Sequence, residues 1–155
     1  MVKYDLGAFV KPLCSWYEKN KRSMPWREQK GAYEVWISEI MLQQTRIEAV
    51  KGYYDRFLKR LPAVKDLAEI PQEELMKLWE GLGYYNRARN LQKAAQKVQD
   101  EYDGVLPADY EKLKSLPGIG NYTAGAIASI AYKIPAPAVD GNVMRVTCLL
   151  YTSDA

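Results

Sequence analysis

The sequence predicts an all-α protein built from many short helices. Apolar residues recur with helical spacing in nearly every segment, as at Leu6, Phe9 and Leu13, and no strand-like alternation competes with them. Prolines and glycines interrupt the pattern at short intervals, which keeps the helices short. The 155 residues, 48% hydrophobic and 26% charged, are enough for one domain with a buried core. This composition excludes a disordered tail, a collagen-like chain and a disulfide-stabilised miniprotein.

Several of the predicted helices have a recognisable boundary. The first follows the i, i+3, i+4 pattern up to a break at 23–26, Pro71 suits the first position of a helix, and Asp103 with Gly104 turns the chain. The predicted helices are, in order, residues 4–20, 33–44, a helix ending at 61–62, 64–69, a helix from 71, 86–102, 109–116, 122–132 and a last helix from about 140.

The sequence has no histidine and only two cysteines, Cys14 and Cys148. The chain therefore cannot form a Ser-His-Asp triad, a Cys-His dyad or a histidine metal site, and two isolated cysteines cannot hold zinc or an iron–sulfur cluster. Acid–base chemistry must rest on carboxylates, tyrosine or lysine. Because no apolar run is long enough to cross a bilayer and no secretory signal is recognisable, we expect a cytoplasmic protein in a reducing compartment.

The segment from Lys11 to Lys30 is basic, with six lysines and arginines against two glutamates, whereas the whole chain has a net charge of only +3. Trp16, Tyr17 and Trp26 lie among these charges. Basic and aromatic residues together suit a nucleic-acid backbone. A solvated helix end is the alternative interpretation.

Residues 116–126, with the sequence LPGIGNYTAGA, place two glycines between two short helices. Gly118 and Gly120 permit positive φ and a close approach to the backbone, and the N–H groups at the start of the second helix can bind an anion. Such a hairpin can grip a DNA phosphate without reading the base sequence. A plain helical hairpin with glycine caps is the alternative, but the length of the motif favours the phosphate site.

Glu39 lies within the otherwise mostly apolar segment 35–45. Burial of an unpaired carboxylate is costly, so its pKa should rise, and a carboxylic acid that stays protonated near neutral pH can act as a general acid. Alternatively, Glu39 faces solvent or pairs with Arg46, since a helix allows it to leave the core. This segment alone slightly favours the alternative.

Asp140 precedes the last predicted helix, within the sequence VDGN at 139–142. It can cap that helix, and the cap is the simpler interpretation. It can also be a partly buried carboxylate aimed into a cleft. The two roles are compatible.

Together these elements resemble the helix-hairpin-helix DNA glycosylases. The segments 36–45 (WISEIMLQQT), 81–88 (GLGYYNRA) and 116–126 are similar, within them, to the MutY-type adenine DNA glycosylases, over about residues 5–146. The resemblance implies a multi-helix helix-hairpin-helix glycosylase fold, incomplete at the C-terminus. It also implies a base-excision repair enzyme that hydrolyses the N-glycosidic bond of adenine mispaired with 8-oxoguanine or guanine.

The resemblance gives the matching residues roles. Glu39 matches the acid that protonates N7 of the flipped adenine, and Asp140 matches the carboxylate that stabilises the oxocarbenium-like sugar. Tyr122 and Asn142 match residues that orient these two carboxyl groups. The other matches are the wall of the adenine pocket (Arg22, Trp26, Leu42), the residues wedged into the duplex (Gln44, Tyr84) and the phosphate-binding glycines (Gly118, Gly120).

Tyr122 separates two kinds of enzyme within this family. The endonuclease III relatives carry a lysine there that forms a Schiff base and cuts the strand, which a tyrosine cannot do. We therefore expect base removal without an efficient lyase step. The alternatives are an endonuclease III-like glycosylase for oxidised pyrimidines and a non-catalytic DNA-binding fragment.

The sequence departs from the resembled family near its end. That family continues into helices with four cysteines that hold a [4Fe-4S] cluster and into a domain that reads the oxidised guanine; we expect neither in this chain, and no metal ligands. We interpret 1–146 as the catalytic region, with its hairpin at about 109–132, and 147–155 as a non-native tail, because the helical pattern fails after Val146. The apolar face of the first helix should then lack a partner. The expected partner is double-stranded DNA with a mispaired adenine, bound by a monomer that does not associate with a membrane.

Overall fold

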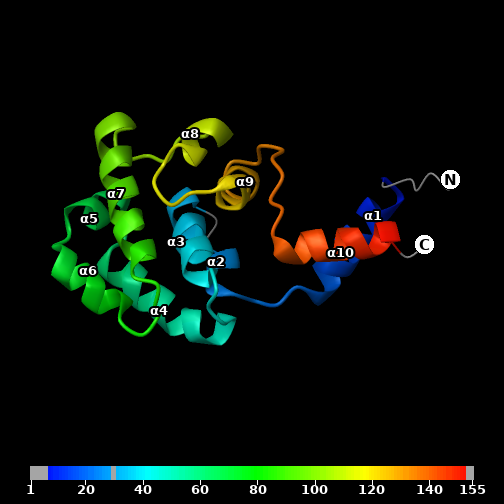
Figure 1. The fold of residues 1–155 in the computed structure, drawn as a ribbon, viewed down its shortest axis with the longest axis horizontal. Coiled ribbons are helices and arrows are strands. Elements are labelled where there is room, and N and C mark those ends of the chain that lie inside the picture. Colours follow the sequence, from blue (N-terminus) through cyan, green and yellow to red (C-terminus); the bar gives the residue numbers. More distant parts are fainter. Residues whose placement is uncertain (1–6, 29–30, 153–155) are drawn as a thin grey trace.

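The computed structural model describes residues 7–28 and 31–152, with side-chain burial given as far as residue 149. Throughout these ranges the regular structure is helical and no strand occurs, which confirms the predicted all-α class (Figure 1). The helices are α1 (Gly7–Asn20), α2 (Pro25–Glu28), α3 (Ala32–Leu42), α4 (Ile47–Arg60), α5 (Val64–Glu69), α6 (Gln72–Trp79), α7 (Asn86–Glu101), α8 (Tyr110–Lys114), α9 (Asn121–Ile130) and α10 (Gly141–Thr152).

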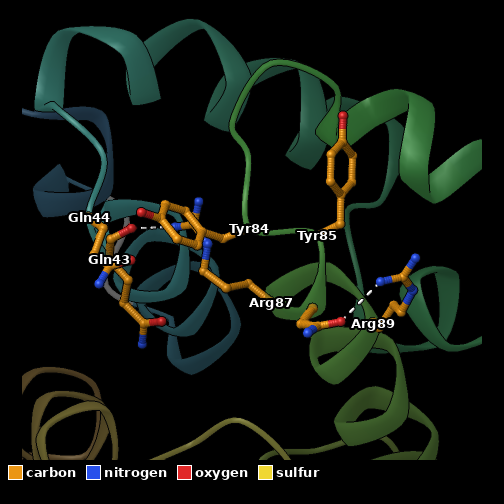
Figure 2. A pocket seen from close by; sticks show the side chains of 7 residues that line it. Gln43, Gln44, Tyr84, Tyr85, Arg87 and Arg89 are labelled. Atoms are coloured by element: carbon orange, nitrogen blue, oxygen red, sulfur yellow. Dashed lines mark hydrogen bonds between the residues drawn. The ribbon is translucent and has the colours of Figure 1, made fainter.

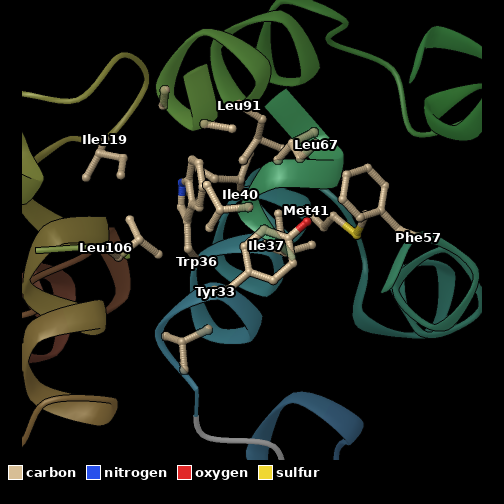
Figure 3. Close-up of a cluster of buried hydrophobic side chains, with 14 of the residues drawn as sticks. Tyr33, Trp36, Ile37, Ile40, Met41, Phe57, Leu67, Leu91, Leu106 and Ile119 are labelled. Carbon is tan, nitrogen blue, oxygen red and sulfur yellow. The ribbon is translucent and has the colours of Figure 1, made fainter. Parts of the chain in front are cut away.

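Helix α3 lies at the centre of the core, because it is apolar around most of its circumference. Trp36, Ile37 and Met41 on this helix have no exposed surface. α3 packs against α4 and α9, and α5 packs against α7. Figure 3 shows Phe57 of α4 and Leu91 of α7 gathered around the α3 side chains. A helix held from several sides is a rigid base for any functional group that it carries.

Helices α1 and α10 extend from the body formed by α2–α9 and lie on the same side of it (Figure 1). Within Gly7–Asn20 no side chain is buried, and residues 141–149 are all exposed. The large apolar side chains exposed on the two helices are Phe9, Val10, Leu13, Trp16, Tyr17, Val143, Met144, Val146 and Leu149. Within the described residues the apolar face of α1 is therefore exposed, with the Arg27 guanidinium 5.7 Å from the ring centroid of Tyr17.

The helix ends differ from the prediction by one or two residues in several places, and Pro71 is the N-cap of α6 rather than its first helical residue. Three further differences have a clear physical reason. The expected break at 23–26 contains the short helix α2, which begins at Pro25, a residue that suits the first helical position. α3 ends at Leu42 rather than residue 44, because Gln43 leaves the helical conformation with a ψ of 115° and Gln44 has a positive φ of 56°. The predicted failure of the helical pattern after Val146 is wrong, since α10 continues to Thr152 and the Thr147 hydroxyl donates a hydrogen bond to the Val143 carbonyl at 2.8 Å.

None of the helices in the described part of the chain is long and apolar enough to cross a membrane.

Candidate active site and neighbouring loops

Glu39 lies on α3 between the buried Ser38 and Ile40, and its own side chain is only partly buried. Burial raises the pKa of its carboxyl group. A hydrogen bond from the Tyr122 hydroxyl and the positive charge of Arg27 oppose this rise, while the negative charge of Asp140 adds to it. The cation that acts on Glu39 is therefore Arg27 of α2 and not Arg46, which lies exposed at the N-cap of α4.

Tyr122 reaches Glu39 from the first turn of α9, because α3 and α9 pack directly against each other. Burial raises the pKa of the phenol, and the neighbouring Glu39 carboxylate raises it further. The phenol therefore keeps its proton and acts as a hydrogen-bond donor. The structure thus brings together two residues that the resemblance assigned to one site, one on each of two helices.

Asp140 stands immediately before α10 and caps it. Its Oδ1 accepts a hydrogen bond from the Val143 backbone N–H at 2.8 Å, and its Oδ2 accepts one from the Asn142 side-chain amide at 3.0 Å. These donors, the Val143 N–H above all, lower the pKa of the Asp140 carboxyl group despite some burial. Asp140 is therefore both a helix cap and an ionised carboxylate close enough to act on Glu39.

The loop that carries Asp140 rests directly on α9 at Gly125. A Cβ atom at this glycine would lie 2.0 Å from the Pro137 carbonyl oxygen, so only glycine permits the contact. Sequence reasoning treated Gly125 as part of the hairpin motif and did not give it this role. The only sequence signal is the run of small residues at 124–126, which predicts a close approach but not its partner.

The three residues predicted to form the adenine pocket have different surroundings. Trp26 is buried, with an edge-to-face contact of 5.5 Å between its ring centroid and that of Tyr54. Arg22 is exposed, and its carbonyl accepts a hydrogen bond from Arg27 at 3.0 Å. Leu42 is half-buried at the end of α3 and packs against the core. A shared pocket wall stays a prediction.

The hairpin between α8 and α9 has the predicted glycine geometry at one of its two positions. Gly118 has a φ of 77°, and a Cβ atom there would lie 2.8 Å from the Cβ of Asn90. Gly120 is exposed in an extended conformation, with open space where a Cβ atom would be. The turn is therefore packed against α7 at Gly118 and open to solvent at Gly120, where the backbone of α9 begins.

Gln44 and Tyr84 lie on two loops that face one cavity. The cavity has a volume of about 630 Å³ and is lined by Gln43, Gln44, Tyr84, Tyr85, Asn86, Arg87 and Arg89 (Figure 2). Both residues are exposed. Both also have a positive φ, 56° at Gln44 and 49° at Tyr84, which is unfavourable for any residue other than glycine. Neither Glu39 nor Asp140 is among the residues that line this cavity.

The described residues contain no group of three or more side chains able to hold a metal ion. With only two cysteines in the sequence, the chain cannot supply the four thiolates of a [4Fe-4S] cluster. Its residues therefore do not fit that cofactor.

The helical fold, the glycine hairpin and the two carboxylates define a class of DNA repair protein. Residues 37–155 match the family model described as HhH-GPD superfamily base excision DNA repair protein, and the chain belongs to this superfamily. Solved structures of DNA glycosylases share its fold. A thermostable thymine-DNA glycosylase has a TM-score of 0.85 and is 32% identical, over 90% of this chain and 65% of that chain. A non-covalent endonuclease III–DNA complex has a TM-score of 0.79 and is 28% identical, over 95% of this chain and 68% of that chain.

Among curated proteins the chain is similar to adenine DNA glycosylases. It is 48% identical to that of Rattus norvegicus (93% of this chain, 30% of the relative) and 47% identical to that of Homo sapiens (93% and 28%). It is 41% identical to that of Buchnera aphidicola subsp. Baizongia pistaciae (94% and 42%). The chain thus spans less than half the length of these relatives.

Proposed function

We propose that the protein containing this chain removes adenine mispaired with 8-oxoguanine or guanine from double-stranded DNA, acting as a monomer. The observation that carries the proposal is the pair of carboxyl groups with opposite pKa shifts, raised at Glu39 and lowered at Asp140. Hydrolysis of a glycosidic bond needs one carboxyl group that donates a proton and one that stays ionised. The similarity to adenine DNA glycosylases supports adenine as the base removed.

In this mechanism Glu39 donates its proton to N7 of an adenine that has left the base stack. The bond between C1′ and N9 breaks, and its electron pair leaves with the base. Asp140 stabilises the positive charge that develops on the sugar, and a water molecule then adds to C1′ and releases a proton. Tyr122 positions Glu39, and Asn142 positions Asp140. A [4Fe-4S] cluster of the family would need cysteines outside these 155 residues.

The test is a panel of duplexes incubated with the full-length protein. Adenine should be released from pairs with 8-oxoguanine and guanine, and neither thymine nor an oxidised pyrimidine should be released. Glu39→Gln should abolish release while duplex binding persists. Release of an oxidised pyrimidine, together with an efficient borohydride-trapped adduct, would instead support an endonuclease III-like enzyme. Salt-sensitive binding without release of any base would show a DNA-binding module.

A further inference from the structure

Arg87 lies between the two loops that carry Gln44 and Tyr84, on the first turn of α7. Its Nη1 donates to three backbone carbonyls at the end of α3, and its Nη2 donates to two carbonyls of the other loop and to a hydroxyl. The acceptors of Nη1 are the carbonyls of Ile40, Met41 and Gln43. The acceptors of Nη2 are the carbonyls of Leu82 and Gly83 and the hydroxyl oxygen of Thr45. One side chain thus joins two loops that lie far apart in the sequence.

The acceptors explain how this partly buried cation is tolerated. The last carbonyls of a helix have no partner within the helix and form the negative end of its dipole, so a cation is stabilised there. Within the described residues, each hydrogen-bond acceptor of Arg87 is a carbonyl or hydroxyl and not a carboxylate. Burial lowers the pKa of Arg87 but leaves the guanidinium charged at neutral pH. A lysine, with three donors on one nitrogen, cannot match the six acceptors that the two Nη groups reach.

The guanidinium also lies against two aromatic rings. Its central carbon is 5.5 Å from the ring centroid of the buried Trp79 and 5.5 Å from that of the exposed Tyr84. In Figure 2 Arg87 extends towards Gln43 and Tyr84, whereas Tyr85 and Arg89 point elsewhere. Arg87 therefore contacts Tyr84 directly and reaches Gln44 through the carbonyl of the residue before it.

We propose that Arg87 is a positioning residue that couples the two loops, so that Gln44 and Tyr84 are held in their positive-φ conformations as one unit for contact with DNA. The contact with DNA rests on the proposed function, but the coupling of the loops does not. Positive φ at both residues has a conformational cost, and the shared guanidinium supplies hydrogen bonds that offset it on both loops.

The coupling is tested first without DNA. Arg87→Lys should speed amide hydrogen exchange at least tenfold in both 42–46 and 81–86, and leave the hairpin at 118–124 unchanged. Arg60→Lys is the matched control, because within the described part of the chain Arg60 forms its ion pair with Glu74 of α6, at 2.7 Å, and not with either loop. Faster exchange in one loop alone, or in neither, would overturn the proposal.

A second measurement uses the unaltered protein and does not depend on whether a variant folds. Nitrogen NMR should show separate, slowly exchanging signals for the two Nη groups of Arg87, because both are held by several acceptors. A single averaged signal would contradict the coupling.

The consequence for DNA is tested by a double-mutant cycle. Arg87→Lys should lower the rate of single-turnover base release at least tenfold without moving its pH profile. Added to a variant that already carries Gln44→Ala and Tyr84→Ala, it should cause almost no further loss. Additive losses would show that Arg87 acts independently of the two loops. If the unaltered protein releases no base while the exchange results hold, the proposed function fails and the coupling stands.

Discussion

Glu39 and Asp140 carry the same functional group in opposite surroundings. Glu39 projects from a helix that is packed on several sides, and burial raises its pKa. Asp140 stands at the start of a helix whose described side chains are all exposed, and backbone and amide donors lower its pKa. The difference shows that the surroundings of each carboxyl group, and not its chemical type, decide whether its pKa is raised or lowered. Density of packing favours the neutral acid, and the free N–H groups of a helix start favour the anion.

The Asp140 half of this comparison is tested by Asp140→Asn. Asparagine caps a helix as well as aspartate does, so the start of α10 should be kept while the negative charge is lost. We expect the rate of base release to fall by about 10²–10³, the range for loss of one electrostatic transition-state contact. Single-turnover kinetics would measure the loss, and an unchanged melting temperature would be the control. Near-normal activity would show that Asp140 only caps the helix and has no catalytic role.

The distance between the two carboxyl groups is tested by Gly125→Ala. The added methyl group would meet the Pro137 carbonyl and must displace the loop that leads to Asp140. Misplacement of a catalytic group by about 1 Å can cost about 10²-fold in rate. We expect a loss of that order together with a lower melting temperature. Gly52→Ala is the control, because a Cβ atom there meets only the end of a flexible arginine at 3.5 Å. Equal behaviour of the two variants would show that the loop position does not matter.

The surroundings of Glu39 are tested by Tyr122→Phe and Arg27→Gln. As the acid, Glu39 must be protonated, so the rate falls when the pH rises through its pKa. The Tyr122 hydrogen bond and the Arg27 charge both stabilise the carboxylate. Their removal should raise the pKa of Glu39 and move this fall to higher pH, further for Tyr122→Phe than for Arg27→Gln. A pH–rate profile measures both shifts. A shift to lower pH in either variant would contradict the assigned surroundings.

The smallest expected effect is on stability. Because the pKa of Glu39 is raised in the folded protein, its contribution to stability is complete below the unfolded pKa and is lost as the pH rises through the folded pKa. Glutamine does not ionise. Glu39→Gln should therefore raise the melting temperature at pH 8, by less than about 3 °C for a partly exposed group, and leave it unchanged at pH 4. A lower melting temperature at pH 8 would mean that the carboxylate is stabilised by the fold.

Local sequence patterns were enough for most of the helices, whereas Glu39 and Asp140 were given their roles by the family resemblance and not by local spacing. The spacing of apolar residues predicts α3, and an aspartate followed by Gly-Asn predicts a helix start. The surroundings of Glu39 could not be predicted in the same way, because Tyr122 and Arg27 reach it through the packing of α9 and α2 against α3. Local spacing left Arg46 as a possible partner, and the three-dimensional packing excludes it.

Arg87 and Gly125 were missed for a different reason. Both lie in recognised motifs, but each acts on backbone atoms of distant segments. Every residue has a carbonyl, so the sequence carries no sign of which ones a guanidinium will meet. The short helix α2 was missed because residues 23–26 were predicted to be a break. The continuation of α10 to Thr152 was missed because residues 147–155 were interpreted as a non-native tail.

The most direct test of the account is the pKa of Glu39 itself. Carbon NMR of the labelled side-chain carboxyl group, titrated from pH 3 to pH 9 in the unaltered protein, would report it without DNA or catalysis. The account predicts a midpoint clearly above the value of about 4.3 for an ordinary glutamate, and a midpoint for Asp140 below the ordinary value of about 3.9. A Glu39 midpoint at or below the ordinary value would show that burial does not favour the protonated acid, which contradicts the role that the mechanism gives to Glu39.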